Sequence, residues 1–270
     1  MTNPTRLALG LSLLLTVAAC AAEESPPLRP APACGVDLVP RDQGPRILFI
    51  GNSLTYWHDV PALLAWLLTE AGVPYDRIDS FTGPDLGLQD HWESAQVQRA
   101  LEQPWDIVVL QQGPSAGEGR ASLVAYACVI AEAVRPRGGV VALFSVWPLR
   151  SQPELFPAVT ESHALAAAAA DGWLLPAGEA WRTAWAARPD FVFYERDGLH
   201  PTALGSYLAA LVMFEQIAGQ AATALPAGFC ARTSGEVRLD EEDARVLQQA
   251  ATAANAAFAR RPAAATVSPD

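Results

Sequence analysis

A serine at the end of a predicted strand is the first residue of this sequence that could do chemistry. The segment ILFIGNSLTYW, residues 47–57, reads as a buried strand that ends at Gly51, and Ser53 stands just before an amphipathic segment. Hydrolysis by a serine requires a base that takes its proton, a group that orients the base, and donors for the oxyanion. Ser53 is therefore a candidate nucleophile, although an ordinary turn residue would also fit this position.

The candidates for the base are the histidines of the chain, which are His58, His91, His163 and His200. His200 lies in RDGLHPTALGSY and follows Asp197 by three residues. Within a single turn, this spacing lets the carboxylate reach the near ring nitrogen and fix the tautomer. Pro201 and Thr202 then start a helix, which would anchor His200 at a helix N-terminus. Alone, the D-x-x-H spacing also fits an ordinary surface loop.

The other histidines fit structural positions better. We expect His91 either to line the site or to pack against the loop after the second strand, and packing is favoured. Asp59, which follows His58, is expected to cap the next helix. His163 lies on an Ala-rich helix and is expected to be exposed. No tight cluster of His, Asp and Glu indicates a metal site, so neither a metal nor another cofactor is expected.

The elements that must position these residues alternate along the chain. Strands are expected at 46–51, 77–82, 106–111, 139–146 and 173–176, and helices at 60–71, 93–102, 121–134, 154–170, 202–218 and 241–260. Such apolar strands suit a mainly parallel sheet of about five strands that is covered on both faces, in a three-layer α/β/α sandwich. Sites of this fold class lie at the carboxyl ends of the strands. Ser53, Gly83 and Gln112 all follow predicted strand ends.

Composition and charge exclude several classes of function. The net charge is -11 and the pI is about 4.8, so nucleic acid is not an expected partner. All basic residues except the histidines are arginines, which excludes Schiff-base chemistry and a Walker-type phosphate loop, since both need a lysine. At 270 residues, one core and a monomer are expected.

The N-terminus has the layout of a bacterial export signal. Arg6 precedes the apolar run LALGLSLLLTVAA, and VAAC, residues 17–20, resembles a lipobox in which Cys20 is lipidated. Cleavage without lipid near residues 19–20 is the alternative. We expect a lipoprotein-type signal at 1–20, a Pro-rich tether at 21–45, one hydrolase-like domain at 46–261 and a disordered tail at 262–270. The protein would then be exported and lipid-anchored at the periplasmic or extracellular face of the cell envelope.

The cysteines that follow this signal are Cys34, Cys128 and Cys230. An exported protein occupies an oxidising compartment, so one disulfide and one free thiol are expected. Cys34 and Cys230 flank the core and are the better pair. Cys128 lies in a helical pattern and is expected to be a small buried hydrophobe.

Two blocks of the sequence resemble the SGNH/GDSL hydrolases. GNSLT, residues 51–55, is similar to the first block in its variant with Asn52 in place of Asp, and DGLHPT, residues 197–202, is similar to the last. The resemblance spans about residues 46–218 and implies a flavodoxin-like SGNH fold and a serine hydrolase of esters. It implies that Ser53 is the nucleophile and one oxyanion donor, that His200 is the base, and that Asp197 orients it. Gly83 matches the glycine of the second block.

The second and third blocks offer alternative residues for the oxyanion hole. Gly87 is the alternative to Gly83, and the third block, LQQGPSAG, departs from the family's G-x-N-D because it has no asparagine. Its piece from Gln112 to Ser115 is similar to the form of sialate and acetyl-xylan esterases, where glutamine is the side-chain donor. An amide of Gln can replace one of Asn, so Gln112 is expected as the donor rather than Gln111.

The predicted function is hydrolysis of a carboxylic ester by a Ser-His-Asp mechanism. Because no long apolar lid segment follows the signal, short acyl groups are favoured, including O-acetyl groups on carbohydrate. Trp57, Trp92 and Trp147 could form an aromatic platform for the substrate, although core packing is the commoner role of tryptophan. Two alternatives stay open: a surface-anchored glycan-binding protein without activity on the same fold, and an acyltransferase that uses the same serine.

Overall fold

The computed structural model describes residues 44–231 and 235–259 of the 270-residue chain. The predicted signal 1–20 with its lipidation site Cys20, the tail 262–270 and nearly all of the tether 21–45 lie outside the described residues. These assignments stay predictions.

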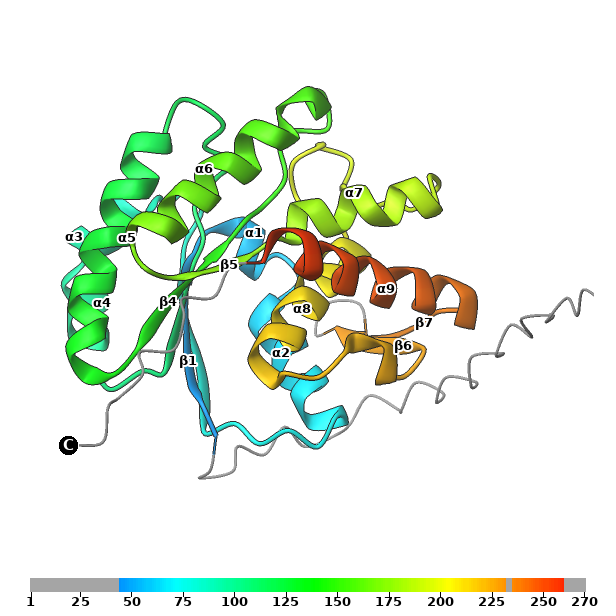
Figure 1. Ribbon diagram of the computed structural model, residues 1–270, viewed down its shortest axis with the longest axis horizontal. Coiled ribbons are helices and arrows are strands. Elements are labelled where there is room, and N and C mark those ends of the chain that lie inside the picture. The colour runs from blue at the N-terminus through cyan, green and yellow to red at the C-terminus, as the bar shows by residue number, and fades with distance from the viewer. Residues whose placement is uncertain (1–43, 232–234, 260–270) are drawn as a thin grey trace, which may run out of the picture.

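A parallel sheet forms the centre of the fold (Figure 1). Its strands are β1 Arg46–Gly51, β2 Arg77–Thr82, β3 Ile107–Leu110, β4 Val140–Phe144 and β5 Trp173–Leu175. They lie in the order β2-β1-β3-β4-β5, and each neighbouring pair is parallel. The predicted five-stranded parallel sheet is confirmed, and each strand overlaps its predicted range.

Helices cover both faces of this sheet and complete the predicted α/β/α sandwich (Figure 1). One layer contains α2 Val60–Glu70, α7 Ala177–Ala187, α8 Ala203–Ala218 and α9 Glu241–Phe258. The other contains α3 Leu88–Glu93, α4 Ala95–Leu101, α5 Arg120–Val134 and α6 Phe156–Ala169. Two buried clusters of apolar side chains fill the spaces between the sheet and these two layers.

The apolar strands follow from this double cover. Ile47 and Phe49 of β1 belong to the cluster under α2 and α8, whereas Leu48 and Ile50 belong to the cluster under α3 and α5. All of these side chains are fully buried. Since successive side chains of a strand point to opposite faces, a strand that is buried on both faces must be apolar at every position.

Polar side chains begin the helices at the expected places. Asp59, Thr202 and Asp240 are the N-caps of α2, α8 and α9, and each side chain accepts the backbone N–H of the residue three positions later. A cap of this kind satisfies one of the free donors of the first turn and typically contributes about 1 kcal/mol. The Thr202 cap fixes the start of α8 directly after His200.

Several short elements differ from the predictions. The helix expected at 93–102 is α4, and a separate helix, α3, that was not expected precedes it and ends at Ser94, whose backbone is extended. The structure also contains α1 Ser53–Tyr56, the helix α7, and an antiparallel pair of strands, β6 Gly228–Ala231 and β7 Gly235–Arg238. Short 3-10 helices lie at Arg135–Arg137, Pro153–Leu155 and Ala222–Ala224.

The cysteines divide between a bonded and a free one. Cys230 on β6 is disulfide-bonded. Cys128 on α5 is a free, partly buried thiol that packs against the apolar cluster under α3 and α5. Cys34, the expected partner of Cys230, lies outside the described residues. The pairing of Cys34 with Cys230 therefore stays a prediction.

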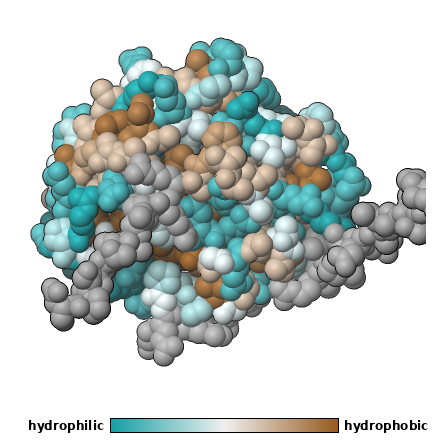
Figure 2. Space-filling model, in the orientation of Figure 1, coloured by the Kyte–Doolittle hydropathy of each residue, from teal (hydrophilic) through white to brown (hydrophobic). Residues whose placement is uncertain are grey.

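The surface mixes polar and apolar groups. On the face shown in Figure 2, hydrophobic residues form separate groups between hydrophilic ones. Among the helices that the structure describes, none combines the length and the apolar character needed to cross a membrane.

Candidate active site

The strand order brings three segments of the chain together at one edge of the sheet. β1 ends just before Ser53, β2 ends one residue before Gly83, and β3 ends just before Gln111 and Gln112. Because β1 lies between β2 and β3 and all three run parallel, the residues after their carboxyl ends are neighbours. The sequence-predicted nucleophile and oxyanion donors therefore share one edge.

The turn that presents Ser53 is fixed by Asn52. The Asn52 side chain is the N-cap of α1, where its Oδ1 accepts the N–H of Leu54 at 3.1 Å. Its Nδ2 donates to the carbonyl of Leu86 at 3.1 Å, which ties the turn to the loop after β2. Ser53 is 7% exposed and opens α1. Among the described residues, no group accepts the Ser53 N–H, so this donor is available to a substrate.

The side-chain amide of Gln111 holds the same turn. Its Oε1 accepts the N–H of Asn52 and the hydroxyl of Thr55, each at 2.8 Å, and the side chain is fully buried. A Cβ at Gly51 would lie 2.6 Å from both this Oε1 and the Thr55 hydroxyl oxygen, so only glycine fits there. The Nε2 of Gln111 is buried without a partner in the described structure, out of reach of a substrate. Gln111 is thus a positioning residue for the turn.

His91 supports the turn from the side of α3. Its Nε2 lies 2.8 Å from the carbonyl oxygen of Gly51, and because a carbonyl only accepts, Nε2 carries the proton. Burial lowers the pKa of His91, although the hydrogen bond to Gly51 opposes the shift. The ring is 3% exposed. His91 therefore packs and holds the strand end, as the favoured reading predicted.

Asp197 and His200 form the local pair that the sequence spacing predicts. Oδ2 of Asp197 lies 2.6 Å from Nδ1 of His200, and Oδ1 accepts the backbone N–H groups of Leu199 and His200. The Leu199 N–H, together with the bonds from His200 and against the effect of burial, lowers the pKa of Asp197 to about 2. The ionised carboxylate accepts a hydrogen bond from Nδ1–H, which leaves Nε2 as the ring nitrogen that can take a proton.

Contacts between two segments hold His200 beside the Ser53 turn. The ring of Trp57 stacks on that of His200 with centroids 4.0 Å apart, and the Trp57 N–H donates to the Ser53 carbonyl at 2.9 Å. Nε2 of His58 lies 3.4 Å from a carboxylate oxygen of Glu195, whose N–H donates to the His200 carbonyl at 2.8 Å. Among the described residues, the His200 ring is bonded to Asp197, and no hydrogen bond joins it to the Ser53 hydroxyl.

The two glycines proposed for the oxyanion hole have partners for their N–H groups. The N–H of Gly83 donates to the Gly51 carbonyl at a long 3.4 Å. The N–H of Gly87 donates to a carboxylate oxygen of Asp90 at 2.7 Å. The weaker bond leaves Gly83 the more available of the two, in line with the order in which the sequence ranked them. Both roles stay proposals.

Gln112 is more constrained than the sequence indicated. Its Nε2 donates to the Ser115 hydroxyl at 3.1 Å and to the Gly119 carbonyl at 3.2 Å, and its Oε1 accepts the N–H of Leu88 at 3.0 Å. A primary amide has two hydrogens, and both are used. In this arrangement Gln112 organises the loop after β3, and it could stabilise an oxyanion only if one of these bonds were exchanged.

The tryptophans do not form one platform. Trp57 is 40% exposed and stacks on His200. Trp147 is fully buried, stacks on Trp181 and donates its ring N–H to the Leu199 carbonyl at 3.0 Å, which fixes the loop before His200. Trp92 packs against the apolar cluster under α3 and α5. The platform reading is therefore wrong for Trp147, because its ring is enclosed by the core, and Trp57 alone lies at the site.

The remaining histidine lies in the core. His163 on α6 was expected to be exposed, but it is fully buried, because α6 is covered on the side that carries this residue, and burial lowers its pKa to about 4. Within residues 44–231 and 235–259, no group of His, Cys, Asp and Glu side chains is arranged to hold a metal ion.

Comparisons with known proteins agree with the fold. No protein-family model matches the chain. No curated protein matches it. A solved candidate SGNH hydrolase from Slackia heliotrinireducens is 27% identical with a TM-score of 0.56, and the match covers 64% of this chain and 98% of that one.

Two further solved structures are more distant in sequence. A DUF4886 family protein from Bacteroides uniformis is 19% identical with a TM-score of 0.61, and the match covers 78% of this chain and 95% of that one. An acetyl xylan esterase is 16% identical with a TM-score of 0.50, and the match covers 64% of this chain and 99% of that one. This chain thus has the fold of the SGNH hydrolases and a distant structural similarity to esterases that share it.

Proposed function

We propose that this protein is a serine esterase that hydrolyses carboxylic esters. Ser53 is the nucleophile, His200 the general base, and Asp197 the residue that orients it. The observation that carries the proposal is the 2.6 Å contact of Asp197 with His200. The His200 ring stacks on Trp57, which lies one helical turn after Ser53 in the chain. A base, its orienter and a serine at a helix start are the parts that acyl transfer needs.

In the proposed mechanism, Nε2 of His200 takes the proton of Ser53, and Oγ attacks the ester carbonyl carbon. The Ser53 N–H, which has no other acceptor among the described residues, stabilises the oxyanion, with the Gly83 N–H and the Gln112 amide as further donors. His200 then protonates the departing alcohol. In the second half, His200 removes a proton from water, which attacks the acyl-enzyme, and returns that proton to Oγ of Ser53 as the bond to the acyl group breaks and the acid is released.

Three adjustments accompany substrate binding in this mechanism, and the first is that Gln112 exchanges its bond to Ser115 or to Gly119 for one to the oxyanion. The Ser53 hydroxyl and His200 come into hydrogen-bond contact, as catalytic pairs often do only when a substrate is bound. Gly83 turns its N–H from the long bond to Gly51 toward the oxyanion. Losing one oxyanion donor typically lowers the rate by about a hundred- to a thousandfold, so these adjustments decide the turnover.

Short acyl esters, including O-acetyl groups on carbohydrate, are the proposed substrates. Tyr56 and Trp57 are 36% and 40% exposed directly after Ser53, and an exposed aromatic surface suits the body of a sugar. The structural similarity to an acetyl xylan esterase supports the same class. A panel of p-nitrophenyl esters with increasing acyl length should show the highest kcat/KM for acetate.

The direct test compares three purified proteins on p-nitrophenyl acetate. Ser53→Ala should lose turnover to the level of the uncatalysed reaction, because the nucleophile is gone. Ser80→Ala is the matched control, since Ser80 is an exposed serine on β2, and it should keep the wild-type rate. Equal rates for wild type and Ser53→Ala would refute the assignment of Ser53.

A binding protein without activity is the second candidate, and one observation favours it. Both amide hydrogens of Gln112 are engaged and the Gly83 N–H has an acceptor, so only the Ser53 donor is free in the described structure. Labelling with a fluorophosphonate separates the two candidates. A covalent adduct on Ser53 of the folded protein favours the esterase, whereas its absence favours a glycan-binding protein.

We also propose that the chain is exported and anchored in the cell envelope by a lipid on Cys20. The support is the VAAC segment after an apolar run. Expression in bacteria with radioactive palmitate should label the wild-type protein. Cys20→Ser should not be labelled, and labelling of this variant would contradict the proposal.

A further inference from the structure

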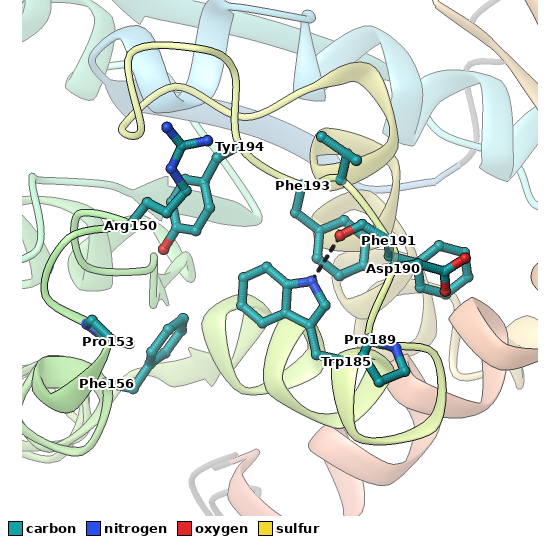
Figure 3. Close-up of a pocket in the computed structure, with 10 residues that line it drawn as sticks. Arg150, Pro153, Phe156, Trp185, Pro189, Asp190, Phe191, Phe193 and Tyr194 are labelled. Carbon is teal, nitrogen blue, oxygen red and sulfur yellow. Dashed lines mark hydrogen bonds between the residues drawn. The ribbon is translucent and has the colours of Figure 1, made fainter.

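A cavity of about 400 Å³ lies beside the loop that carries Asp197 and His200, and nothing in the proposed mechanism uses it (Figure 3). Its walls come from the end of α7, the segment 189–194 that follows it, and the start of α6. The aromatic side chains that line it are Phe156, Trp185, Phe191, Phe193 and Tyr194. This volume is in the range of pockets for small-molecule ligands.

The polar atoms of these aromatic rings already have partners. The Tyr194 hydroxyl donates to the Pro148 carbonyl at 2.7 Å, and the Trp185 ring N–H donates to the Phe191 carbonyl at 2.9 Å, as the dashed line in Figure 3 marks. The rings therefore offer apolar surface to the cavity and no free hydrogen-bonding groups. A sugar that lay against these rings would gain no hydrogen bonds from them, whereas an apolar ligand would cover their surface, so an apolar ligand is favoured.

Arg150 supplies a positive charge at one end. It lines the cavity, and its backbone N–H donates to the Gly198 carbonyl at 2.8 Å, so it lies against the Asp197 loop. Its guanidinium has one long bond, 3.4 Å, to the Arg196 carbonyl. In the part of the chain that the structure describes, no carboxylate lies within ion-pair distance of it. A guanidinium without an ion pair is well suited to a carboxylate, which it can bind with two hydrogen bonds.

Asp190 makes the cavity asymmetric. It lines the end opposite Arg150, as Figure 3 shows, and its negative charge repels an anion there. We propose that this cavity binds a small monocarboxylate with an apolar body, whose carboxylate pairs with Arg150 and whose body packs among Trp185, Phe191 and Tyr194. The binding does not depend on chemistry at Ser53.

Isothermal titration calorimetry with octanoate, octylamine and propionate tests the charge and the apolar body separately. Octanoate should bind the purified protein more tightly than octylamine, which lacks the negative charge, and than propionate, which lacks the long body. Arg150→Gln should weaken octanoate binding by about ten- to a hundredfold, the usual effect of losing a hydrogen bond to a charged group. Arg150→Glu should reverse the preference, so that octylamine binds more tightly than octanoate.

Arg196→Gln is the matched control, because Arg196 is an exposed arginine whose backbone carbonyl contacts Arg150 but which does not line the cavity. It should bind octanoate as the wild type does. Ser53→Ala should also keep the octanoate affinity, which separates this proposal from the esterase assignment. The proposal is overturned if octanoate does not bind, if octylamine binds the wild type equally well, or if Arg150→Gln leaves the octanoate affinity unchanged.

Discussion

Gln111→Met removes the acceptor that two buried donors share below the Ser53 turn. Oε1 of Gln111 accepts the N–H of Asn52 and the hydroxyl of Thr55, both at 2.8 Å, and Asn52 and Thr55 are 7% and 0% exposed. Methionine has a similar length but no strong acceptor. Water cannot replace the lost oxygen at a site that is closed to solvent, so both donors would stay unsatisfied.

The magnitude follows from the groups that lose or regain partners. Each buried donor without an acceptor costs about 1–3 kcal/mol, so two cost about 2–6 kcal/mol. Nε2 of Gln111 is already buried without a partner in the described structure, and its removal returns about 1–3 kcal/mol. We expect Gln111→Met to lower the free energy of unfolding by about 1–3 kcal/mol. It should also lower kcat for p-nitrophenyl acetate more than it changes KM, because the nucleophile is held less firmly.

A double-mutant cycle with Thr55→Val measures whether the shared acceptor causes the effect. In the Thr55→Val background, Gln111→Met leaves only the Asn52 N–H unsatisfied, so its cost should be smaller by roughly 1 kcal/mol, within the range of coupling between residues in contact. Urea unfolding of the wild type, both single variants and the double variant gives this coupling. A cost of Gln111→Met that is identical in both backgrounds would show that the two donors do not share Oε1.

Three further expectations concern stability and covalent structure. Gly51→Ala should destabilise the protein by about 1–3 kcal/mol in urea unfolding, because its Cβ would lie 2.6 Å from Gln111 Oε1, and an unchanged midpoint would contradict this. Burial lowers the pKa of His163 to about 4, so the free energy of unfolding is highest above pH 6.5 and falls as the pH decreases toward 4. His163→Leu should make the free energy of unfolding less dependent on pH in this range, and a variant with the wild-type pH dependence would contradict this. Peptide mapping without reductant should find Cys230 linked to Cys34, and a Cys230 thiol open to alkylation would disagree.

The inner strands of the central sheet could be predicted from the sequence because β1, β3 and β4 are buried on both faces, whereas the edge strand β2 is only partly buried. Runs such as residues 47–50 and 107–110 are apolar at every position, and no other element explains such short runs between turn residues. The elements that were missed have weaker patterns. α7 contains Gly178 in its first turn and follows Pro176, and both residues weaken a helical signal. β6 and β7 are four residues each, too short for a clear alternation.

By itself, the sequence indicated the contact of Asp197 with His200, because residues three apart in one turn are within reach of each other. It also placed Ser53, Gly83 and Gln112 at strand ends. Only the tertiary structure decided what the neighbouring amides do. Gln111 and Gln112 are successive residues after β3, so their side chains point in different directions, and the sheet order that puts β1 beside β3 turns Gln111 toward the Ser53 turn. Gln112 instead meets the loop residues Ser115 and Gly119, a contact that depends on packing across the sheet edge rather than on sequence spacing.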